Sequence, residues 1–138
     1  MVLLAIGSNL SSRYGDRFKN IDIAVSSLNG YGISVKKQSS YYETDSYPNK
    51  ENPKFINIVV ETETDLPPED LASVLIFIEE SLQRERGKKN DPRTCDIDII
   101  DYKGQIHKFS FNNQNLEIPH KEIINRNFVL LPLQEIAP

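Results

Sequence analysis

Short apolar stretches and stretches with a helical period alternate along this chain, and their order restricts the fold more than any other feature. Residues 2–6 are apolar and lead into a Gly-Ser-Asn turn, which predicts a buried strand. A helical period follows, with Asp16 as a candidate N-cap and Asn29-Gly30 as the stop. The apolar positions of this predicted helix are Phe18, Ile21, Val25 and Leu28.

The next part of the chain predicts two more strands with a loop between them. Residues 33–42 form a more polar strand pattern, and turn-forming residues fill 43–53, which predicts a long loop. Residues 55–62 then alternate in polarity. We therefore expect Phe55 and Asn57 to share one face of a strand.

A second helix, a further strand and two shorter elements complete the pattern. Pro67 and Pro68 precede a long apolar stripe that should end before Gly87. A strand follows from about Cys95 to Tyr102, then a hairpin within residues 103–117, and a short C-terminal helix that Pro132 should interrupt.

The order strand, helix, strand, strand, helix, strand is typical of an α+β fold. The split βαβ arrangement predicts a ferredoxin-like domain, with an antiparallel sheet and both helices on one face. A chain of 138 residues is long enough for one core. We expect a single domain over residues 1–138.

Composition excludes several classes of function. The net charge of −4 and pI near 5.2 argue against a partner that is nucleic acid or an anionic membrane. The N-terminus has no basic leader and the chain has no membrane-spanning apolar run, so we expect a cytoplasmic protein. The one cysteine, Cys95, stands in an apolar run and is predicted to be a small buried side chain.

The chemistry is concentrated in the stretch KKNDPRTCDIDII, residues 88–100. Residues two apart in a strand point to one face, so Asp96 and Asp98 should project together, opposite Cys95, Ile97 and Ile99. Two such carboxylates repel, and a hard divalent cation bound together with substrate phosphates offsets that repulsion. The alternatives are an exposed polar edge of the strand and a carboxylate pair neutralised by nearby arginine. On this basis we expect substitution of either aspartate to leave stability equal or higher.

The segment before this strand is rich in Lys and Arg side chains, as expected for contact with phosphate oxygens. Arg84 and Arg86 are also explained as complements to a helix dipole, but Arg93 next to the strand is not. No P-loop pattern is present. The five cations of this segment are Arg84, Arg86, Lys88, Lys89 and Arg93.

Two further features suggest a flat organic substrate. Phe55 offers a ring for stacking, and the Asn57 amide can donate and accept hydrogen bonds at once. The alternative is a core phenylalanine beside a strand amide. His120 lies in a short polar stretch near Arg126 and Phe128, where a lone histidine is more often a helix cap or hydrogen-bonding residue than a catalyst.

Together these segments resemble the 6-hydroxymethyl-7,8-dihydropterin pyrophosphokinases of folate synthesis, in order and spacing along the whole chain. The Pro-Arg-Thr-x-Asp-x-Asp core is the most specific of them. The segments that support the resemblance are AIGSNL at 5–10, FINIVVET at 55–62, DPRTCDIDII at 91–100, IPH at 118–120 and NRNFVLLPLQEIAP at 125–138.

The resemblance implies transfer of a pyrophosphoryl group from ATP to the pterin hydroxymethyl oxygen, leaving AMP. Asp96 and Asp98 would hold two Mg²⁺ ions. The two aspartates would be the catalytic groups, together with Arg84 and Arg93. The predicted ATP contacts are Glu79, Arg84, Arg93, His120 and Arg126, and the predicted pterin contacts are Thr44, Phe55, Asn57 and Phe128.

The chain departs from the family pattern before the Pro-Arg-Thr, where Asn90-Asp91 replaces the frequent tryptophan and glycine. Two alternatives therefore stay open. One is a weak or silent relative that binds nucleotide or a folate-pathway partner. The other is an RNA-binding module of similar fold, which the missing basic, aromatic sheet face disfavours. A monomer is expected, although the sequence does not determine the oligomeric state.

Overall fold

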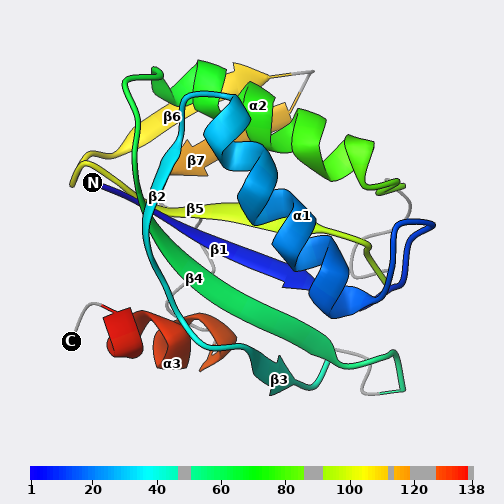
Figure 1. Cartoon of the computed structure of the whole chain (residues 1–138). Coiled ribbons are helices and arrows are strands. Elements are labelled where there is room, and N and C mark those ends of the chain that lie inside the picture. The colour runs from blue at the N-terminus through cyan, green and yellow to red at the C-terminus, as the bar shows by residue number, and fades with distance from the viewer. Residues whose placement is uncertain (47–50, 86–91, 112–113, 119–126, 137–138) are drawn as a thin grey trace.

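The computed structural model of the chain describes residues 1–46, 51–85, 92–111, 114–118 and 127–136. Antiparallel strands and three helices form an α+β fold, as predicted (Figure 1). The elements are β1 (Val2–Ser8), α1 (Arg17–Gly30), β2 (Ser34–Gln38), β3 (Tyr42–Thr44), β4 (Phe55–Glu63), α2 (Pro68–Ser81), β5 (Asp96–Tyr102), β6 (His107–Phe111), β7 (Gln114–Ile118) and α3 (Asn127–Ile136).

The main sheet has the strand order β2-β4-β1-β5, and β3 extends the β2 side by pairing with the other end of β4. β6 and β7 form a separate hairpin. The central strand β1 is buried along its whole length, because helices cover both faces of the sheet. None of the described helices is both long and apolar enough to cross a membrane.

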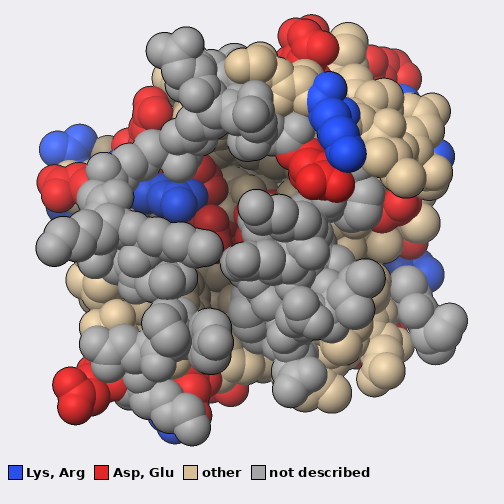
Figure 2. Space-filling model, turned by 180° about the vertical axis from the view of Figure 1, so that it is seen from behind, with Lys and Arg blue, Asp and Glu red and all other residues tan. Residues whose placement is uncertain are grey.

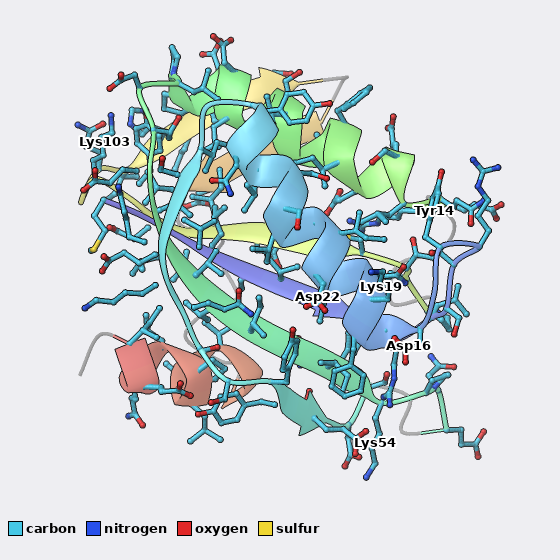
Figure 3. The ribbon with its side chains drawn as sticks, in the orientation of Figure 1. Tyr14, Asp16, Lys19, Asp22, Lys54 and Lys103 are labelled. Atoms are coloured by element: carbon cyan, nitrogen blue, oxygen red, sulfur yellow. The ribbon has the colours of Figure 1, made fainter. Side chains whose placement is uncertain are left out.

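α1 and α2 lie side by side on one face of the sheet and enclose the larger core (Figure 1). Their apolar stripes pack against the alternate strand residues Leu4, Ile6 and Ile58. Asp16 caps α1 as predicted, with its carboxylate accepting a hydrogen bond from the Lys19 backbone N–H at 2.9 Å (Figure 3).

Phe18 does not belong to this core. It is 40% exposed and stacks edge to face on Tyr41, whereas the predicted stripe counted it as apolar contact surface. The buried position in that first turn is taken by Asn20, whose side chain hydrogen-bonds to Ser12 at 2.6 Å and to the Leu10 carbonyl at 3.0 Å. A satisfied amide can therefore replace a hydrophobic residue at the helix start.

The single strand predicted over residues 33–42 is wrong in one respect, because it breaks between β2 and β3. The Ser39 hydroxyl accepts a hydrogen bond from the Val59 backbone N–H at 2.9 Å, and the Ser40 backbone N–H donates to Glu135. Side-chain oxygens thus replace backbone partners at the break. β3 consequently begins only at Tyr42 and overlaps the predicted loop.

α3 covers the opposite face of the sheet and runs through Pro132 rather than being interrupted by it. A proline removes one helical hydrogen bond and crowds the preceding turn. Burial of Val129 and Ile136 against β1, β4 and β5 opposes that effect. Local propensity predicted a break, and tertiary packing outweighs it.

Candidate functional site

The strand register places a candidate substrate-binding residue of β4 and the two aspartates of β5 on one face of the sheet, on either side of β1. Gly7 of β1 pairs with Asn57 of β4 and with Asp96 of β5, and Ala5 pairs with Asp98. Directly opposed residues point to the same face. Because neighbouring strands lie about 4.8 Å apart, β4 and β5 stand roughly 10 Å apart across the small side chains of β1.

The face turned away from α1 and α2 is hollowed near its centre (Figure 2). Among the residues drawn in colour, Asp and Glu side chains lie in the hollow and a Lys or Arg side chain lies at its border. The register shows that Ala5 and Gly7 of β1 point to the same face of the sheet as Asp96 and Asp98 of β5.

One side of the site, here called the charged wall, lies where the end of α2 meets β5 and consists of Glu79, Arg84, Arg93, Asp96 and Asp98. Arg84 Nη1 lies 2.6 Å from Glu79 Oε2 and 3.2 Å from Asp96 Oδ1. Arg93 Nη1 lies 3.1 Å from Asp96 Oδ2. Both oxygens of Asp96 are thus paired with guanidinium groups, which are the groups that also bind phosphate oxygens best.

A sharp turn after α2 brings Arg84 into this cluster. Gln83 adopts a left-handed conformation with φ of 68°, and the Arg84 backbone N–H donates to the Glu79 carbonyl at 3.1 Å. This geometry is typical of a helix C-terminus, where the residue is most often glycine. The turn returns Arg84 to the last turn of the helix, beside Glu79.

Glu79 is 3% exposed and ties α2 to β5. Besides its ion pair with Arg84, its Oε2 accepts a hydrogen bond from the Ile97 backbone N–H at 2.7 Å. A buried carboxylate needs such partners. Glu79 therefore positions Arg84 and the first part of β5, whereas the ATP contact predicted for it stays a prediction.

The electrostatics of the charged wall keep Arg84 protonated. Burial alone lowers the pKa of Arg84, but the attraction of Glu79, Asp96 and Asp98 outweighs burial and raises it. The neighbouring Cys95 is fully buried, and this burial raises the pKa of its thiol well above the ordinary value. The prediction that Cys95 is a buried side chain is confirmed, and a neutral thiol is a poor nucleophile.

The other side of the site, here called the neutral wall, consists of Asn9, Thr44, Ser46, Phe55 and Asn57. Thr44 pairs with Phe55 in the register of β3 and β4, and the Asn57 side-chain amide donates to Thr44 Oγ1 at 2.8 Å. Phe55 is half-buried and Asn57 is 5% exposed. Three of the four predicted pterin contacts are thus adjacent.

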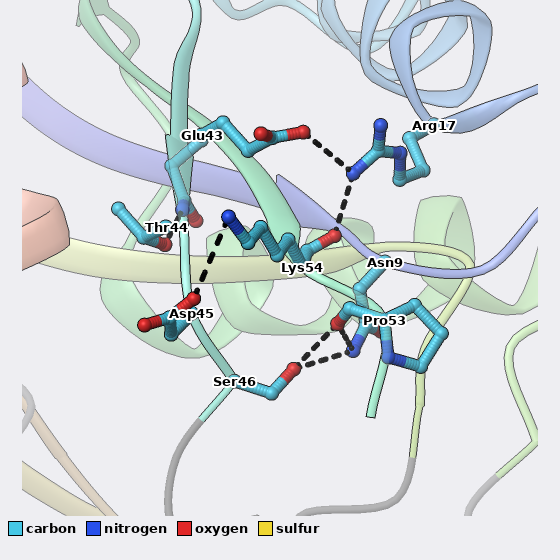
Figure 4. A network of polar contacts seen from close by, with 9 residues as sticks. Asn9, Arg17, Glu43, Thr44, Asp45, Ser46, Pro53 and Lys54 are labelled. Atoms are coloured by element: carbon cyan, nitrogen blue, oxygen red, sulfur yellow. Dashed lines mark hydrogen bonds and ion pairs between the residues drawn. The ribbon is translucent and has the colours of Figure 1, made fainter. Parts of the chain in front are cut away.

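Asn9 is the residue that the sequence analysis missed, since the Gly-Ser-Asn turn was treated only as a strand end. It is 2% exposed, and its Nδ2 donates to Ser46 Oγ at 3.1 Å and to the Pro53 carbonyl at 3.0 Å (Figure 4). Its Oδ1 accepts from the Arg93 backbone N–H at 2.6 Å. One buried amide therefore joins both walls. The sequence signal that could have identified Asn9 was a side-chain amide directly after a strand predicted to be buried.

The segment before β4 has a second set of contacts on its outer side (Figure 4). Arg17 lies 3.3 Å from Glu43 and donates to the Lys54 carbonyl at 2.8 Å, and Lys54 lies 3.8 Å from Asp45. These ion pairs are exposed and contribute little individually. The buried Asn9 contacts are the stronger constraint on this segment.

The remaining predicted site residues are not placed here. His120 and Arg126 lie outside the described residues, as do Asn90 and Asp91. Phe128 falls in the first turn of α3, but its side chain is not among those described.

The donor set at β5 fits a hard cation. Within the described ranges no group of three or more His, Cys, Asp and Glu side chains is arranged to hold a metal ion. Mg²⁺, however, is usually bound through one or two carboxylates together with water and substrate phosphates. Asp96 and Asp98, on one face and about 7 Å apart along the strand, provide that number of protein ligands.

Paired carboxylates, half-buried guanidinium groups and a neighbouring amide with an aromatic ring define the class of site: one suited to a phosphorylated nucleotide and a flat polar ring. Residues 3–138 match the family model described as 7,8-dihydro-6-hydroxymethylpterin-pyrophosphokinase (HPPK). The chain belongs to this family, which confirms the resemblance inferred from its motifs.

Curated relatives agree with the assignment. The chain is 37% identical over 140 residues to the 2-amino-4-hydroxy-6-hydroxymethyldihydropteridine pyrophosphokinase of Bacillus subtilis (strain 168), covering 97% of this chain and 76% of that protein. The Methylorubrum extorquens protein of the same name is 35% identical over 136 residues, covering 98% of this chain and 81% of that protein.

Longer relatives match as well. The folic acid synthesis protein FOL1 of Dictyostelium discoideum is 40% identical over 138 residues, which are all of this chain and 20% of that protein. The chain spans 26% of a folate synthesis bifunctional protein of Arabidopsis thaliana. It therefore corresponds to a fifth to a quarter of these longer relatives.

Proposed function

We propose that the protein transfers a pyrophosphoryl group from ATP to the hydroxymethyl oxygen of 6-hydroxymethyl-7,8-dihydropterin, giving the pterin diphosphate and AMP in folate synthesis. Family membership supports the reaction. The observation that supports it best in this chain is the register across β1, which sets Asn57 opposite Asp96 with only Gly7 between them.

The charged wall would bind the triphosphate. Asp96 and Asp98 would hold Mg²⁺, two ions by the resemblance, and the bound metal would neutralise phosphate charge and align the transferred group. Arg84 and Arg93 would exchange part of their contact with Asp96 for phosphate oxygens. Such positioning and charge neutralisation are most of what phosphoryl transfer requires from a protein.

The neutral wall would bind the pterin. Phe55 offers a ring face, and the Asn57 amide and Thr44 offer hydrogen-bonding groups to the edge of a flat heterocycle. Phe128 would cover the other face of the ring. His120 and Arg126 would contact ATP from beyond the described residues.

The proposed reaction requires no nucleophile from the protein. The pterin hydroxymethyl oxygen forms a bond to the β-phosphorus, the bond between this phosphorus and the oxygen bridging to the α-phosphorus breaks, and AMP leaves. Asp98 is a candidate acceptor for the proton that the hydroxyl loses, because it lies on the same face as Asp96.

We also infer that the fold is ferredoxin-like and that residues 1–138 form one domain. The chain order β1-α1-β2-β4-α2-β5, the central position of β1 and the position of α1 and α2 on one face support the first inference. The family match over residues 3–138 supports the second. The cytoplasmic location and the monomeric state stay predictions.

The test is incubation with ATP, Mg²⁺ and the pterin, with the nucleotide product resolved as AMP or ADP. AMP that forms only with the pterin supports pyrophosphoryl transfer. Folded protein that binds ATP in the presence of Mg²⁺ but yields no AMP would contradict the proposal and favour the silent relative. Lack of Mg²⁺-dependent ATP binding would favour a binding module instead.

A further inference from the structure

Gly7 stands where a glycine is otherwise unfavourable, in the interior of the central strand β1. Glycine weakens a strand, since it has more conformational freedom to lose and no side chain to pack. The backbone conformation at position 7 does not require a glycine. The described glycines with positive φ are Gly15, Gly32 and Gly104. The reason for Gly7 must therefore lie in its neighbours.

One of those neighbours lies too close for a Cβ atom at position 7. A Cβ atom added to Gly7 would lie 2.6 Å from Asn57 Oδ1 and 3.5 Å from both Phe55 Cδ1 and the Ile56 carbonyl oxygen. The last two distances are ordinary contacts. The first is a clash, so Gly7 specifically accommodates the amide of Asn57.

The clash would be relieved by rotation of the Asn57 amide and not by displacement of β1. β1 is hydrogen-bonded to β4 on one side and β5 on the other, so its backbone cannot withdraw. The Asn57 amide is the end of a side chain and can rotate. Rotation breaks its hydrogen bond to Thr44 Oγ1, now 2.8 Å, and redirects both of its polar atoms.

We propose that Gly7 is a specificity-determining positioning residue for the ring-binding side of the site. It lets the Asn57 amide lie over β1 with Oδ1 toward Gly7 and Nδ2 toward Thr44. The orientation of this amide determines which donor and acceptor atoms are presented to a flat, amide-containing heterocycle. This inference rests on the proposed function, because it assigns that heterocycle to the pterin substrate.

The charged wall should be unaffected by a Cβ at this position. The three atoms nearest to it belong to Asn57, Ile56 and Phe55, and none carries charge. Gly7→Ala is therefore expected to raise the KM for the pterin about 10-fold to 100-fold, as expected when a buried polar contact is lost, with the KM for ATP unchanged.

The experiment compares Gly7→Ala with Gly30→Ala at the end of α1, where an added Cβ meets nothing within 4 Å. Steady-state kinetics are measured for both substrates, and pterin binding is measured by calorimetry with Mg²⁺ and a non-hydrolysable ATP analogue. The same pair is made in an Asn57→Ala background, which removes the clashing atom.

Loss of pterin affinity in Gly7→Ala, but no further loss when Gly7→Ala is added to Asn57→Ala, supports the inference. Equal losses in both backgrounds, or a Gly7→Ala protein that behaves like Gly30→Ala, would overturn it. If Gly7→Ala folds poorly, recovery of its unfolding temperature in the double variant supports the clash with Asn57, and no recovery contradicts it. A wild-type protein without pterin-dependent AMP formation would refute the proposed function separately.

Discussion

The two walls of the site are held together by different kinds of interaction. In the neutral wall, the Asn9 amide is hydrogen-bonded to the Ser46 hydroxyl and the Pro53 carbonyl, and the Asn57 amide is hydrogen-bonded to the Thr44 hydroxyl. In the charged wall, Arg84 and Arg93 meet the carboxylates of Glu79 and Asp96. Neutral hydrogen bonds depend on geometry and respond little to ions, whereas exposed or half-buried charges respond to any new ion that enters.

This difference suits two different substrates. A flat ring with fixed donors and acceptors is recognised by groups that do not move, since a misplaced polar atom stays unpaired. A triphosphate with its metal brings its own charges and must exchange them with those already present. Under the proposed function, the arginine pairs of Asp96 would be contacts that are exchanged when ATP binds.

Asp96→Asn should have the largest effect on the charged wall. The change removes the proposed metal ligand and the partner of two guanidinium groups while keeping the shape of the side chain. We expect turnover to fall about 1000-fold or more, as when a principal stabilising group for transition-state charge is lost. The measurement is pterin-dependent AMP formation at saturating ATP and Mg²⁺.

Asp101→Asn, on the same strand but outside the site, is the matched control and should retain full turnover. The structure also revises the expected effect on stability. Asp96 is paired with Arg84 and Arg93, so its substitution removes attractions as well as repulsion. An unfolding temperature that does not rise is now expected. Normal turnover of Asp96→Asn would contradict the role of this wall.

Glu79→Ala should have the largest effect on stability. It leaves the Arg84 guanidinium and the Ile97 backbone N–H without their shared acceptor in a buried place. Removing one partner of a buried pair costs about 3–5 kcal/mol. Chemical denaturation, with Glu80→Ala as a control at an exposed neighbouring position, measures the difference.

Equal stabilities of the Glu79→Ala and Glu80→Ala proteins would show that Glu79 does not connect α2 to β5. The kinetics provide a second readout. If Glu79 positions Arg84, the KM for ATP should rise in Glu79→Ala, whereas the KM for the pterin should stay near the wild-type value.

Asn9→Asp tests whether the neutral wall depends on donor geometry. The carboxylate keeps an acceptor for the Arg93 backbone N–H but has no N–H for Ser46 Oγ or the Pro53 carbonyl. Two lost donations in a buried place should cost about 1–3 kcal/mol and lower kcat/KM for the pterin about 10-fold.

The control is Asn29→Asp at the exposed end of α1, where the change should stay within about 0.3–1 kcal/mol. Ser46→Ala removes two hydrogen bonds of the same network, one accepted from Asn9 and one donated to the Pro53 carbonyl. It leaves Asn9 bonded to Pro53 and Arg93 and should have a smaller effect than Asn9→Asp. If Ser46→Ala and Asn9→Asp were both indistinguishable from wild type, Asn9 would not link the two walls.

Much of this arrangement could be predicted from the sequence, because it depends on local periods. The two-residue period of a strand predicted that Phe55 and Asn57 share a face, and that Asp96 and Asp98 do so opposite buried isoleucines. Asp16 was predicted as a helix cap from its position alone.

The features that sequence reasoning missed depend on partners far away in the chain. The contacts of Asn9 reach residues 37, 44 and 84 positions away, which no local pattern encodes. The strand break at Ser39 depends on Val59, and the continuity of α3 through Pro132 depends on packing against the sheet. Register between strands was also needed before Gly7 could be seen between Asn57 and Asp96.

Glu135→Gln is expected to have the smallest effect, because it acts on the neutral wall only through β3. Glu135 accepts hydrogen bonds from Tyr42 Oη at 2.7 Å and from the Ser40 backbone N–H at 3.0 Å. The Tyr42 hydrogen bond, followed by the Ser40 backbone bond, holds the pKa of Glu135 below its ordinary value. The same contact raises the pKa of Tyr42.

The sign of the pH effect follows from these shifts. A carboxylate with a lowered pKa in the folded state stabilises the fold above its unfolded pKa of about 4.3, and this contribution is lost as the pH falls through the folded value. Tyr42 keeps its proton until the pH exceeds about 10. The difference in unfolding temperature between wild type and Glu135→Gln should therefore be constant from neutral to mildly alkaline pH and shrink below about pH 4.

Thermal unfolding between pH 3 and 9 measures this difference, with Glu63→Gln on the exposed end of β4 as the control. Because Glu135 is on the surface, the difference should be small, and salt should reduce it further. The KM for the pterin should stay unchanged in Glu135→Gln at neutral pH, since Asn9 and Asn57 hold the neutral wall from inside. A rise in that KM, or a stability difference that grows as the pH falls, would show that the neutral wall depends on charge after all.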